Sequence, residues 1–334
     1  MWLRSHPPVA LWHTGSVRFV LAVIMAGILF GTTGTAQALG TDGSNPISVG
    51  AARLVFGGGL LALVSWWMSK RRTSSAVQLG EFDLTPDPEP GPIRTKHRVP
   101  SWLVAVLGGL AVLIYQPCFF GGTQLNGVAV GTVVALGSAP VFTGIFEGLL
   151  NRRFPGRTWT IATSGAIIGV TVLALASAEG SGGAGPLGLL VSAGAGLAYA
   201  TYTVFIKMLL GRGWSSSTAV GTLFGLAGVG ALPLLALSSP SWIGTAPGIS
   251  MVVWLALVTT VIANLLFGFG LVGLNASTVS TLTLAEPLTA SLLGLFLLHE
   301  QLTLTSSVGL LVLGAAIVYL AAASGRKQTV TKFD

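Results

Sequence analysis

Long apolar stretches fill this chain, and most of its charged residues lie between them. The hydrocarbon core of a bilayer is roughly 30 Å thick, so a helix needs about 20 apolar residues to span it. Stretches of about this length occur ten times, and we predict a membrane-spanning helix in each. They cover residues 17–38, 46–69, 100–122, 126–149, 158–178, 186–210, 216–237, 247–271, 275–298 and 303–323. The pattern predicts an all-α polytopic membrane protein with ten transmembrane helices.

The composition supports this interpretation. Only 8% of the residues are charged, and the mean hydropathy is +0.80, which excludes an ordinary soluble core. Ten spans leave little of the 334 residues for a water-soluble domain. The membrane bundle is therefore expected to carry the function.

The charges are distributed unevenly between the two sides of the predicted bundle. With a cytoplasmic N-terminus, every Lys and Arg except Arg53 falls in or beside an inside segment. These residues are Arg4, Arg18, Lys70, Arg71, Arg72, Arg94, Lys96, Arg98, Arg152, Arg153, Arg157, Lys207, Arg212, Arg326, Lys327 and Lys332. An excess of positive charge marks cytoplasmic loops. We therefore expect a multi-pass protein of a cell membrane (inner or plasma), with cytoplasmic tails at 1–16 and 324–334.

The longest polar segment covers residues 70–99. It begins with KRR, continues with the acidic, Pro-rich run EFDLTPDPEPGP, and ends near RTKHR. Its low hydrophobicity and repeated Pro predict a disordered cytoplasmic loop. The alternative is that its basic ends contact lipid headgroups or a partner.

An internal repeat organises the chain. The segments YQPCFFGGTQLNGVAVGTVVALGSAP and NLLFGFGLVGLNASTVSTLTLAEP both open a span with Leu-Asn and place a Pro within it. The matching positions are Leu125-Asn126 with Leu274-Asn275, and Pro140 with Pro287. The repeat predicts two units of five spans each, at 17–178 and 186–323.

Five is an odd number, so two homologous units must enter the membrane in opposite directions. This arrangement is an inverted repeat, which is typical of secondary transporters that bind substrate near the midplane between the halves. The first span resembles a signal peptide, with Arg18, an apolar run and Ala36-Gln37-Ala38. We expect it to be retained, because the repeat needs it as the counterpart of the sixth span.

Two sequence motifs, one in the second half and one in the second span, are similar to those of a known family. Glu286-Pro287 is followed by LTASLLGLFLLHEQLT, in which the second glutamate is Glu300, and Arg53 lies in the second-span motif AARLVFGGGLLAL. The chain thereby resembles the EamA-type transporters of the drug/metabolite transporter superfamily over essentially 17–323. The first half departs from the pattern, with Ala139-Pro140 in place of the EP pair and Arg153 where the second half has Glu300.

This resemblance implies ten helices in two inverted repeats. It also implies export or exchange of amino acids, related metabolites or drugs, without indicating one substrate. The expected partners are therefore a small molecule and the lipid bilayer, with protons as a candidate coupling ion. No cofactor is implied.

Glu286 lies midway along the ninth predicted span. Ionisable groups at membrane depth cost free energy and are candidates for function. Glu286 is a candidate proton carrier or a partner for a substrate ammonium group; a structural carboxylate held by a neighbouring helix is the alternative. Pro287 removes a backbone hydrogen bond, so we expect it to kink the helix and free a carbonyl.

Arg53 is the one basic residue inside the outer half of a predicted span, about 10 Å from its outer end at 1.5 Å per residue. It is expected either to pair with Glu286 or to bind a substrate carboxylate. Snorkelling to the outer interface remains the alternative.

Other polar side chains inside the spans can line a cavity, and helix–helix hydrogen bonds explain them equally well. They are Tyr115, Gln116, Tyr199, Tyr202, Trp254 and Asn264. Lys207 and Glu147 lie nearer the cytoplasmic ends, and we predict interface anchoring for them. For Glu300, at the outer end of the ninth span, we predict a turn or capping role.

Enzyme signatures are missing from the sequence: there is no P-loop, HExxH or GxSxG motif. One cysteine and scattered histidines also argue against a metal site or disulfide framework. The prediction is a secondary active transporter, with a passive facilitator, a lipid-acting membrane enzyme and a receptor or scaffold as rivals. Glycine pairs at four-residue spacing would allow a homodimer but are more simply explained by packing inside the bundle.

Overall fold

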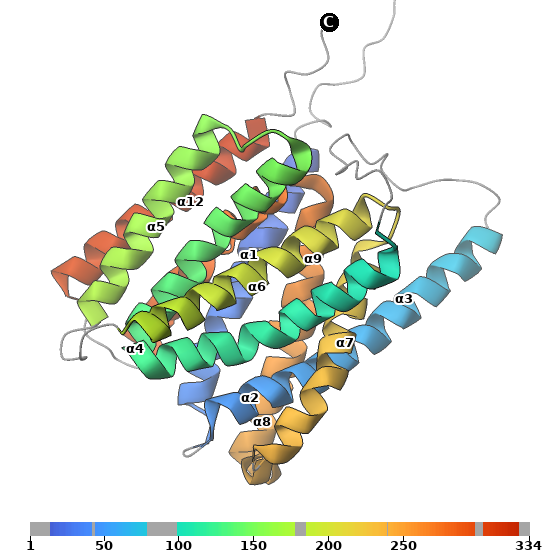
Figure 1. The fold of residues 1–334 in the computed structure, drawn as a ribbon, viewed down its shortest axis with the longest axis horizontal. Helices are drawn as coiled ribbons and strands as arrows, with labels where there is room; N and C mark the ends of the chain where they lie inside the picture. Colours follow the sequence, from blue (N-terminus) through green and yellow to red (C-terminus); the bar gives the residue numbers. More distant parts are fainter. Residues whose placement is uncertain are drawn as a thin grey trace, which may run out of the picture.

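The computed structural model describes residues 14–41, 44–78, 99–177, 185–238, 240–297 and 303–326. The secondary structure of this part is helical (Figure 1), and ten segments are long and apolar enough to cross a membrane. They are Ser16–Ala38, Pro46–Arg71, Ser101–Gly127, Val130–Asn151, Arg157–Ala176, Pro186–Leu210, Ser216–Leu237, Ala246–Gly273, Ala276–Leu297 and Leu304–Gly325. Each overlaps one predicted span, so the prediction of a ten-span all-α membrane protein is confirmed.

The third and fourth spans form a hairpin within one continuous element, α4 (Ser101–Asn151). The chain reverses at Gly127, whose φ of 79° and ψ of 155° are conformations that residues with a Cβ rarely adopt. Gly131 then allows the two arms to close, because a Cβ there would lie 2.6 Å from the Cα of Thr123. This glycine pair therefore serves the hairpin itself.

Two spans contain a π-helical segment. In the second span, η2 (Arg53–Gly58) separates α2 (Pro46–Ala52) from α3 (Gly59–Gln78). In the eighth span, η4 (Leu257–Ile262) separates α8 (Ala246–Ala256) from α9 (Ala263–Gly273). The two π segments contact each other across the bundle. π-helical turns disturb the regular hydrogen-bond ladder and occur frequently at functional sites.

The ninth span is broken. α10 (Ala276–Leu282) ends before a turn at Thr283 and Leu284, and α11 (Ala285–Leu297) begins after it. Pro287 is the third residue of α11, where its missing N–H and fixed φ are compatible with the first turn of a helix but not with a continuous α10–α11 helix. The break therefore lies directly before Glu286, whose backbone N–H donates to the Thr283 carbonyl at 2.9 Å.

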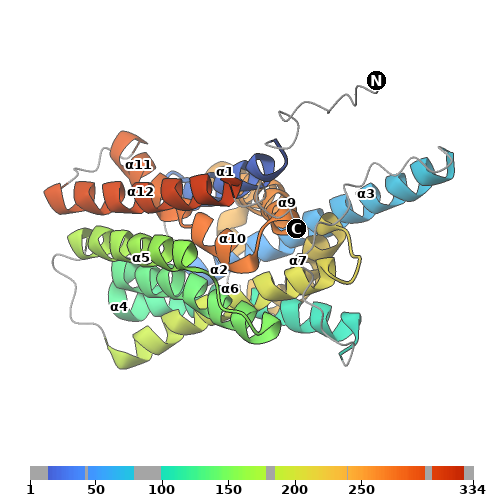
Figure 2. The same cartoon turned by 90° about the horizontal axis from the view of Figure 1, so that it is seen from above.

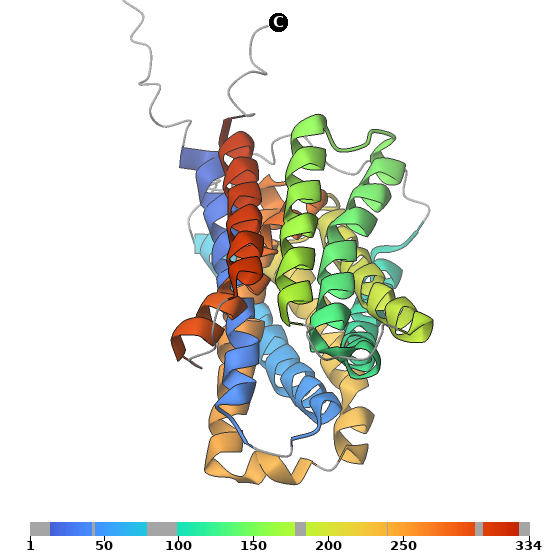
Figure 3. The same ribbon diagram turned by 90° about the vertical axis from the view of Figure 1, so that its left-hand side faces the viewer.

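The remaining elements are α1 (Thr14–Ala38), α5 (Arg157–Ser177), α6 (Pro186–Leu210), α7 (Ser216–Leu237), η3 (Pro240–Gly244) and α12 (Leu304–Arg326). Helix α6 packs along α4, and α12 runs beside α5 (Figures 1 and 2), so both of these contacts join the two halves. Figure 3 shows α1 in blue beside α12 in red, with the green helices of the first half next to them. The two halves are thus interleaved rather than set side by side.

One boundary prediction is wrong. We expected residues 70–99 to form a loop, but α3 remains helical to Gln78. Lys70 lies over the ring of Trp66 at 4.0 Å and Arg71 over that of Trp67 at 3.6 Å, each four residues further along the helix. Such pairs stabilise an exposed helical turn. Residues 79–98 lie outside the described part. Of the predicted tails 1–16 and 324–334, residues 14–16 and 324–326 are helical, and the rest lies outside the described part.

Most glycine pairs noted in the sequence pack inside the bundle. A Cβ at Gly31 would lie 2.6 Å from the Glu286 carbonyl, and one at Gly169 would lie 2.6 Å from the Leu313 nitrogen. A Cβ at Gly225 would lie 2.8 Å from that of Ala62. These glycines let neighbouring helices approach closely, which is the usual role of small residues in membrane bundles.

Candidate functional site

Polar side chains from both halves meet between the helices. Arg53 comes from η2, Tyr115 from α4, Tyr199 and Tyr202 from α6, and Glu286 from the start of α11. Their charges and phenol groups lie close enough to interact electrostatically. We call these five residues the central cluster. The sequence had selected all five as candidates, and the structure brings them together.

Arg53 is held by the opposite π segment. Its Nε donates to Thr260 Oγ1 and its Nη2 donates to the Thr259 carbonyl, both at 3.2 Å. Both threonines are buried in η4. Since the guanidinium is directed into the bundle at η4, the snorkelling alternative for Arg53 does not describe this structure. The hydrogen bonds described for Arg53 go to η4, while Glu286 acts on it electrostatically.

Glu286 occupies the first turn of α11 and is only partly buried. The positive end of a helix dipole favours an anionic group there. Close approach of α1 holds this turn in place, since Cβ atoms at Gly27 and Gly31 would lie within 3.4 Å of the Glu286 backbone. The carboxyl group is therefore positioned by a helix break and by two glycines of a neighbouring helix.

The three tyrosine rings of the central cluster lie close to one another. The Tyr199 ring centroid lies 5.0 Å from that of Tyr202 and 6.3 Å from that of Tyr115. The Tyr199 hydroxyl is 2.8 Å from Thr283 Oγ1, in the break of the ninth span. Phe267 of α9 is 6.1 Å from Tyr199. A ligand at this cluster would thus meet two opposite charges, phenol hydroxyls and aromatic faces.

The other predicted site residues have different surroundings. Gln116 is buried in α4, where its Oε1 would lie 3.3 Å from a Cβ at Gly50. Asn264 Nδ2 donates to the Thr260 carbonyl at 2.8 Å and so supports the π segment that holds Arg53. Trp254 is 44% exposed and donates to Thr32 of α1 at 3.0 Å, so its described hydrogen bond goes to α1 and not to a residue of the central cluster.

Two charged residues were misjudged from the sequence. Interface anchoring was predicted for Glu147 and Lys207, but Glu147 is only 4% exposed, and its Oε2 accepts from the Ser277 N–H at 3.0 Å. Lys207 Nζ donates to the carbonyls of Leu271 and Leu274, at 2.7 and 2.9 Å. The prediction used only the positions of Glu147 and Lys207 near the ends of their spans. It could not show that the turn between α9 and α10 offers them backbone hydrogen-bond partners.

The hydroxyl groups of α10 were also overlooked. Thr163 and Thr281 hydroxyls are 2.8 Å apart, and Thr143 donates to Ser280 at 3.3 Å. Trp159 Nε1 donates to the Ser277 carbonyl at 3.0 Å. The sequence signal was the run STVSTLT, in which hydroxyl residues occupy most positions of an apolar span. These bonds join the ninth span to the first half.

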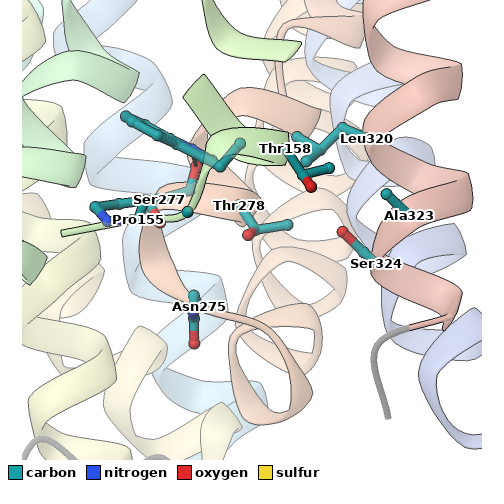
Figure 4. Close-up of a pocket in the computed structure, with 10 residues that line it drawn as sticks. Pro155, Thr158, Asn275, Ser277, Thr278, Leu320, Ala323 and Ser324 are labelled. Atoms are coloured by element: carbon teal, nitrogen blue, oxygen red, sulfur yellow. Dashed lines mark hydrogen bonds between the residues drawn. The ribbon is translucent and has the colours of Figure 1, made fainter. Parts of the chain in front are cut away.

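A pocket of about 100 Å³ lies at the Asn275 end of α10 (Figure 4). Its lining residues are Pro155, Gly156, Thr158, Trp159, Asn275, Ser277, Thr278, Leu320, Ala323 and Ser324. Arg152, Arg153 and Arg157 are exposed close by in the sequence, so we call this end of the bundle the Arg152 end. Within the described ranges, no group of three His, Cys, Asp or Glu side chains is placed to bind a metal ion. Glu300 lies outside the described residues.

Comparison with known proteins agrees with this architecture. The EamA-like transporter family matches residues 17–175 and again residues 186–322. A Bacillus subtilis (strain 168) protein, described as the uncharacterized transporter YwfM, is 32% identical over 311 residues, or 93% of this chain and 96% of that protein. A protein of solved crystal structure has a similar fold, with a TM-score of 0.70 over 93% of this chain and 98% of its own, at 17% identity.

Proposed function

Since this chain belongs to the EamA-like transporter family and is a transporter rather than an enzyme, we propose that it is a secondary active transporter that exports amino acids or related small metabolites. The two units, 17–178 and 186–323, would move against each other in alternating access around the central cluster. Energy would come from a proton or substrate gradient, because the sequence contains no nucleotide-binding P-loop.

The observation that carries the proposal is that Arg53 and Glu286, two opposite charges that act on each other electrostatically, belong to one cluster with three tyrosines. An arginine guanidinium is well suited to a carboxylate, and a carboxylate to an ammonium group. The two opposite charges therefore complement a zwitterion. Contributions from η2 and α4 on one side and from α6 and α11 on the other make the cluster sensitive to relative motion of the halves.

The membrane orientation is part of the proposal. We place the Arg152 end in the cytoplasm, because the Lys and Arg residues outside the spans fall on one side of the predicted topology. Both termini would then be cytoplasmic, and the protein would lie in a cell membrane. The homodimer stays a prediction. The glycine pairs described above do not support it, because they pack inside the bundle.

Transport by the purified protein in proteoliposomes tests this function. Labelled amino acids would be offered with and without a pH gradient, to the parent protein and to Glu286→Gln. We expect saturable flux that depends on the gradient and falls by about tenfold or more in the variant, since an amide cannot take up and release a proton as a carboxyl group does.

Each other outcome has a defined meaning. Saturable flux that ignores the gradient and persists in Glu286→Gln would remove the proton role and favour a passive facilitator or an exchanger. An absence of amino acid flux, with saturable flux of a drug or another metabolite, would replace the substrate class while retaining the transporter. Normal elution of the variant as a single species in detergent is the control for folding.

A further inference from the structure

The turn between α9 and α10 is held by two opposite charges. We call residues 271–277 the α9–α10 corner. Lys207 of α6 donates to two carbonyls in the last turn of α9, and Glu147 of α4 accepts from the N–H of Ser277 in the first turn of α10. Helix ends leave carbonyls and N–H groups without partners inside the helix. The two side chains satisfy these groups with the charges that the helix dipoles favour.

The two residues belong to different halves and act on each other. Glu147 lies in the fourth span, in the first half, whereas Lys207 lies in the sixth, in the second half. The Glu147 carboxylate interacts electrostatically with Lys207. Lys207 therefore joins α6 to the corner within the second half, while Glu147 connects that assembly to the first half. Separation of the halves here requires the Glu147 contact to break.

Helix α10 connects the corner to the central cluster. From Asn275 at the Arg152 end, α10 leads to Thr283, whose hydroxyl contacts Tyr199. Along this length α10 is bonded to the first half through Ser280 and Thr281. A path from the Arg152 end to Glu286 between the halves would thus have to pass α10.

Space for movement exists beside the corner. Asn275, Ser277 and Thr278 line the pocket shown in Figure 4, opposite Leu320 and Ser324 of α12. The Ser277 hydroxyl is buried and has no hydrogen-bond partner among the described residues. The corner is therefore held by Glu147 and Lys207, and it is less tightly packed where it borders the pocket.

We propose that Glu147 and Lys207 are positioning residues of the transport cycle, which hold the α9–α10 corner and thereby close the Arg152 end of the path to the central cluster. The proposal rests on alternating access, as stated under the proposed function. Opening at this end replaces the Glu147 contact with water and moves α10 away from α4 and α5. Neither residue needs to touch the substrate.

Cysteine accessibility tests this proposal without any substrate or proton gradient. Cys118 is the only cysteine, so Cys118→Ser removes the background, and Ser280→Cys reports on the closed interface, where Ser280 is 1% exposed. The rate of N-ethylmaleimide labelling would be measured in membranes. We expect Lys207→Met, which removes the donor, to raise it about tenfold, as loss of a charge-assisted hydrogen bond predicts. Glu147→Gln keeps an acceptor oxygen but loses the charge, so it should raise the rate by a smaller factor, and Lys207→Arg should leave it near the parent rate.

We call Glu147 and Lys207, in this proposed role, the Glu147–Lys207 latch. Two controls distinguish that role from a general structural role. Ala166→Cys reports on a fully buried position in α5, and it should stay unlabelled in all variants that open only at the corner. Arg71→Met removes one positive charge at the exposed end of α3 and should change neither rate. Unchanged labelling at 280 in Glu147→Gln and Lys207→Met would overturn the proposal, and so would an equal rise at 166 and 280. Because no flux is measured, these outcomes are independent of substrate and coupling ion.

Discussion

At the scale of single residues, the main question is how a membrane bundle accommodates Arg53. A cationic group away from water needs hydrogen-bond partners and charge compensation. η4 supplies the partners through Thr259 and Thr260, and Glu286 contributes opposite charge. The two bonds use the Nε and one N–H of Nη2, so the guanidinium keeps further donors that a substrate carboxylate could bind.

Arg53→Ala is therefore expected to weaken transport of zwitterionic and anionic substrates more than transport of cations. Loss of charge-assisted hydrogen bonds is worth about 1.5–3 kcal/mol, which corresponds to roughly 10- to 100-fold in apparent affinity. Proteoliposome flux with substrates of matched size and different charge measures the effect. Thr260→Val removes one acceptor of Arg53 while preserving shape, and it should cost much less. A uniform loss for all substrates, together with poor folding, would assign Arg53 a structural role.

At the scale of elements, interruptions of helices position the chemistry. η2 begins at Arg53, η4 supplies its partners, and the break in the ninth span lies just before Glu286. A regular helix would direct each side chain by its 3.6-residue period alone. A π segment or a break changes that period locally and frees backbone groups, so it can turn a polar residue toward the interior.

Packing of α1 against α11 is predicted to be essential for this placement. At Gly31, a Cβ would lie 2.6 Å from the Glu286 carbonyl and 2.7 Å from Thr289 Cβ, so Gly31→Ala must displace the start of α11. Overpacking of this kind typically costs about 1–3 kcal/mol. We expect a lower midpoint of thermal unfolding in detergent, and reduced flux.

Gly34→Ala provides the matched control on the same helix, because nothing lies within 4 Å of a Cβ at that position. It should match the parent protein in both measurements. Identical melting of the two variants would mean that the α1–α11 contact is looser than the structure indicates.

At the scale of the whole molecule, the two halves are interleaved, and this determines which helices form the interface between them. Helix α6 of the second half packs on α4, and α12 packs on α5, so the halves share long interfaces rather than one seam. The contacts made by α10 with the first half include four hydrogen bonds, two of them between hydroxyl groups. Polar contacts of this type can be exchanged for water, whereas the α5–α12 contact is close at Gly169 and Leu313, where a Cβ on the glycine would lie 2.6 Å from the Leu313 nitrogen.

The orientation of this assembly gives a further prediction. In the Cys118→Ser background, Ser44→Cys, between the first two spans, should react with a membrane-impermeant maleimide in intact cells. Phe154→Cys, which is 69% exposed at the Arg152 end, should react only after permeabilisation. This expectation rests on the proposed orientation, in which the positive-inside rule would put these arginines in the cytoplasm. The opposite labelling pattern would invert the topology and place the Glu147–Lys207 latch on the outer side.

Much of this protein followed from sequence alone. Hydropathy and charge act segment by segment along the chain, so the ten spans and the odd number of spans per repeat could be deduced without tertiary contacts. The same reasoning selected Arg53 and Glu286, because a charge within an apolar span has few structural explanations. It failed at the end of the second span, where a loop was predicted from residue 70. There Lys70 and Arg71 stack on tryptophans, and the helix continues through polar sequence to Gln78.

Only the tertiary structure decided which groups meet. Arg53 and its acceptor Thr260 are 207 residues apart, and Glu147 and Ser277 are 130 residues apart. No local pattern encodes such pairs, since each residue's partner depends on how distant helices rotate and where they break. For the same reason, Glu147 and Lys207 resembled interface anchors in the sequence yet bind a buried corner. Span length and sidedness are properties of single segments, whereas the central cluster and the latch exist only where several segments converge.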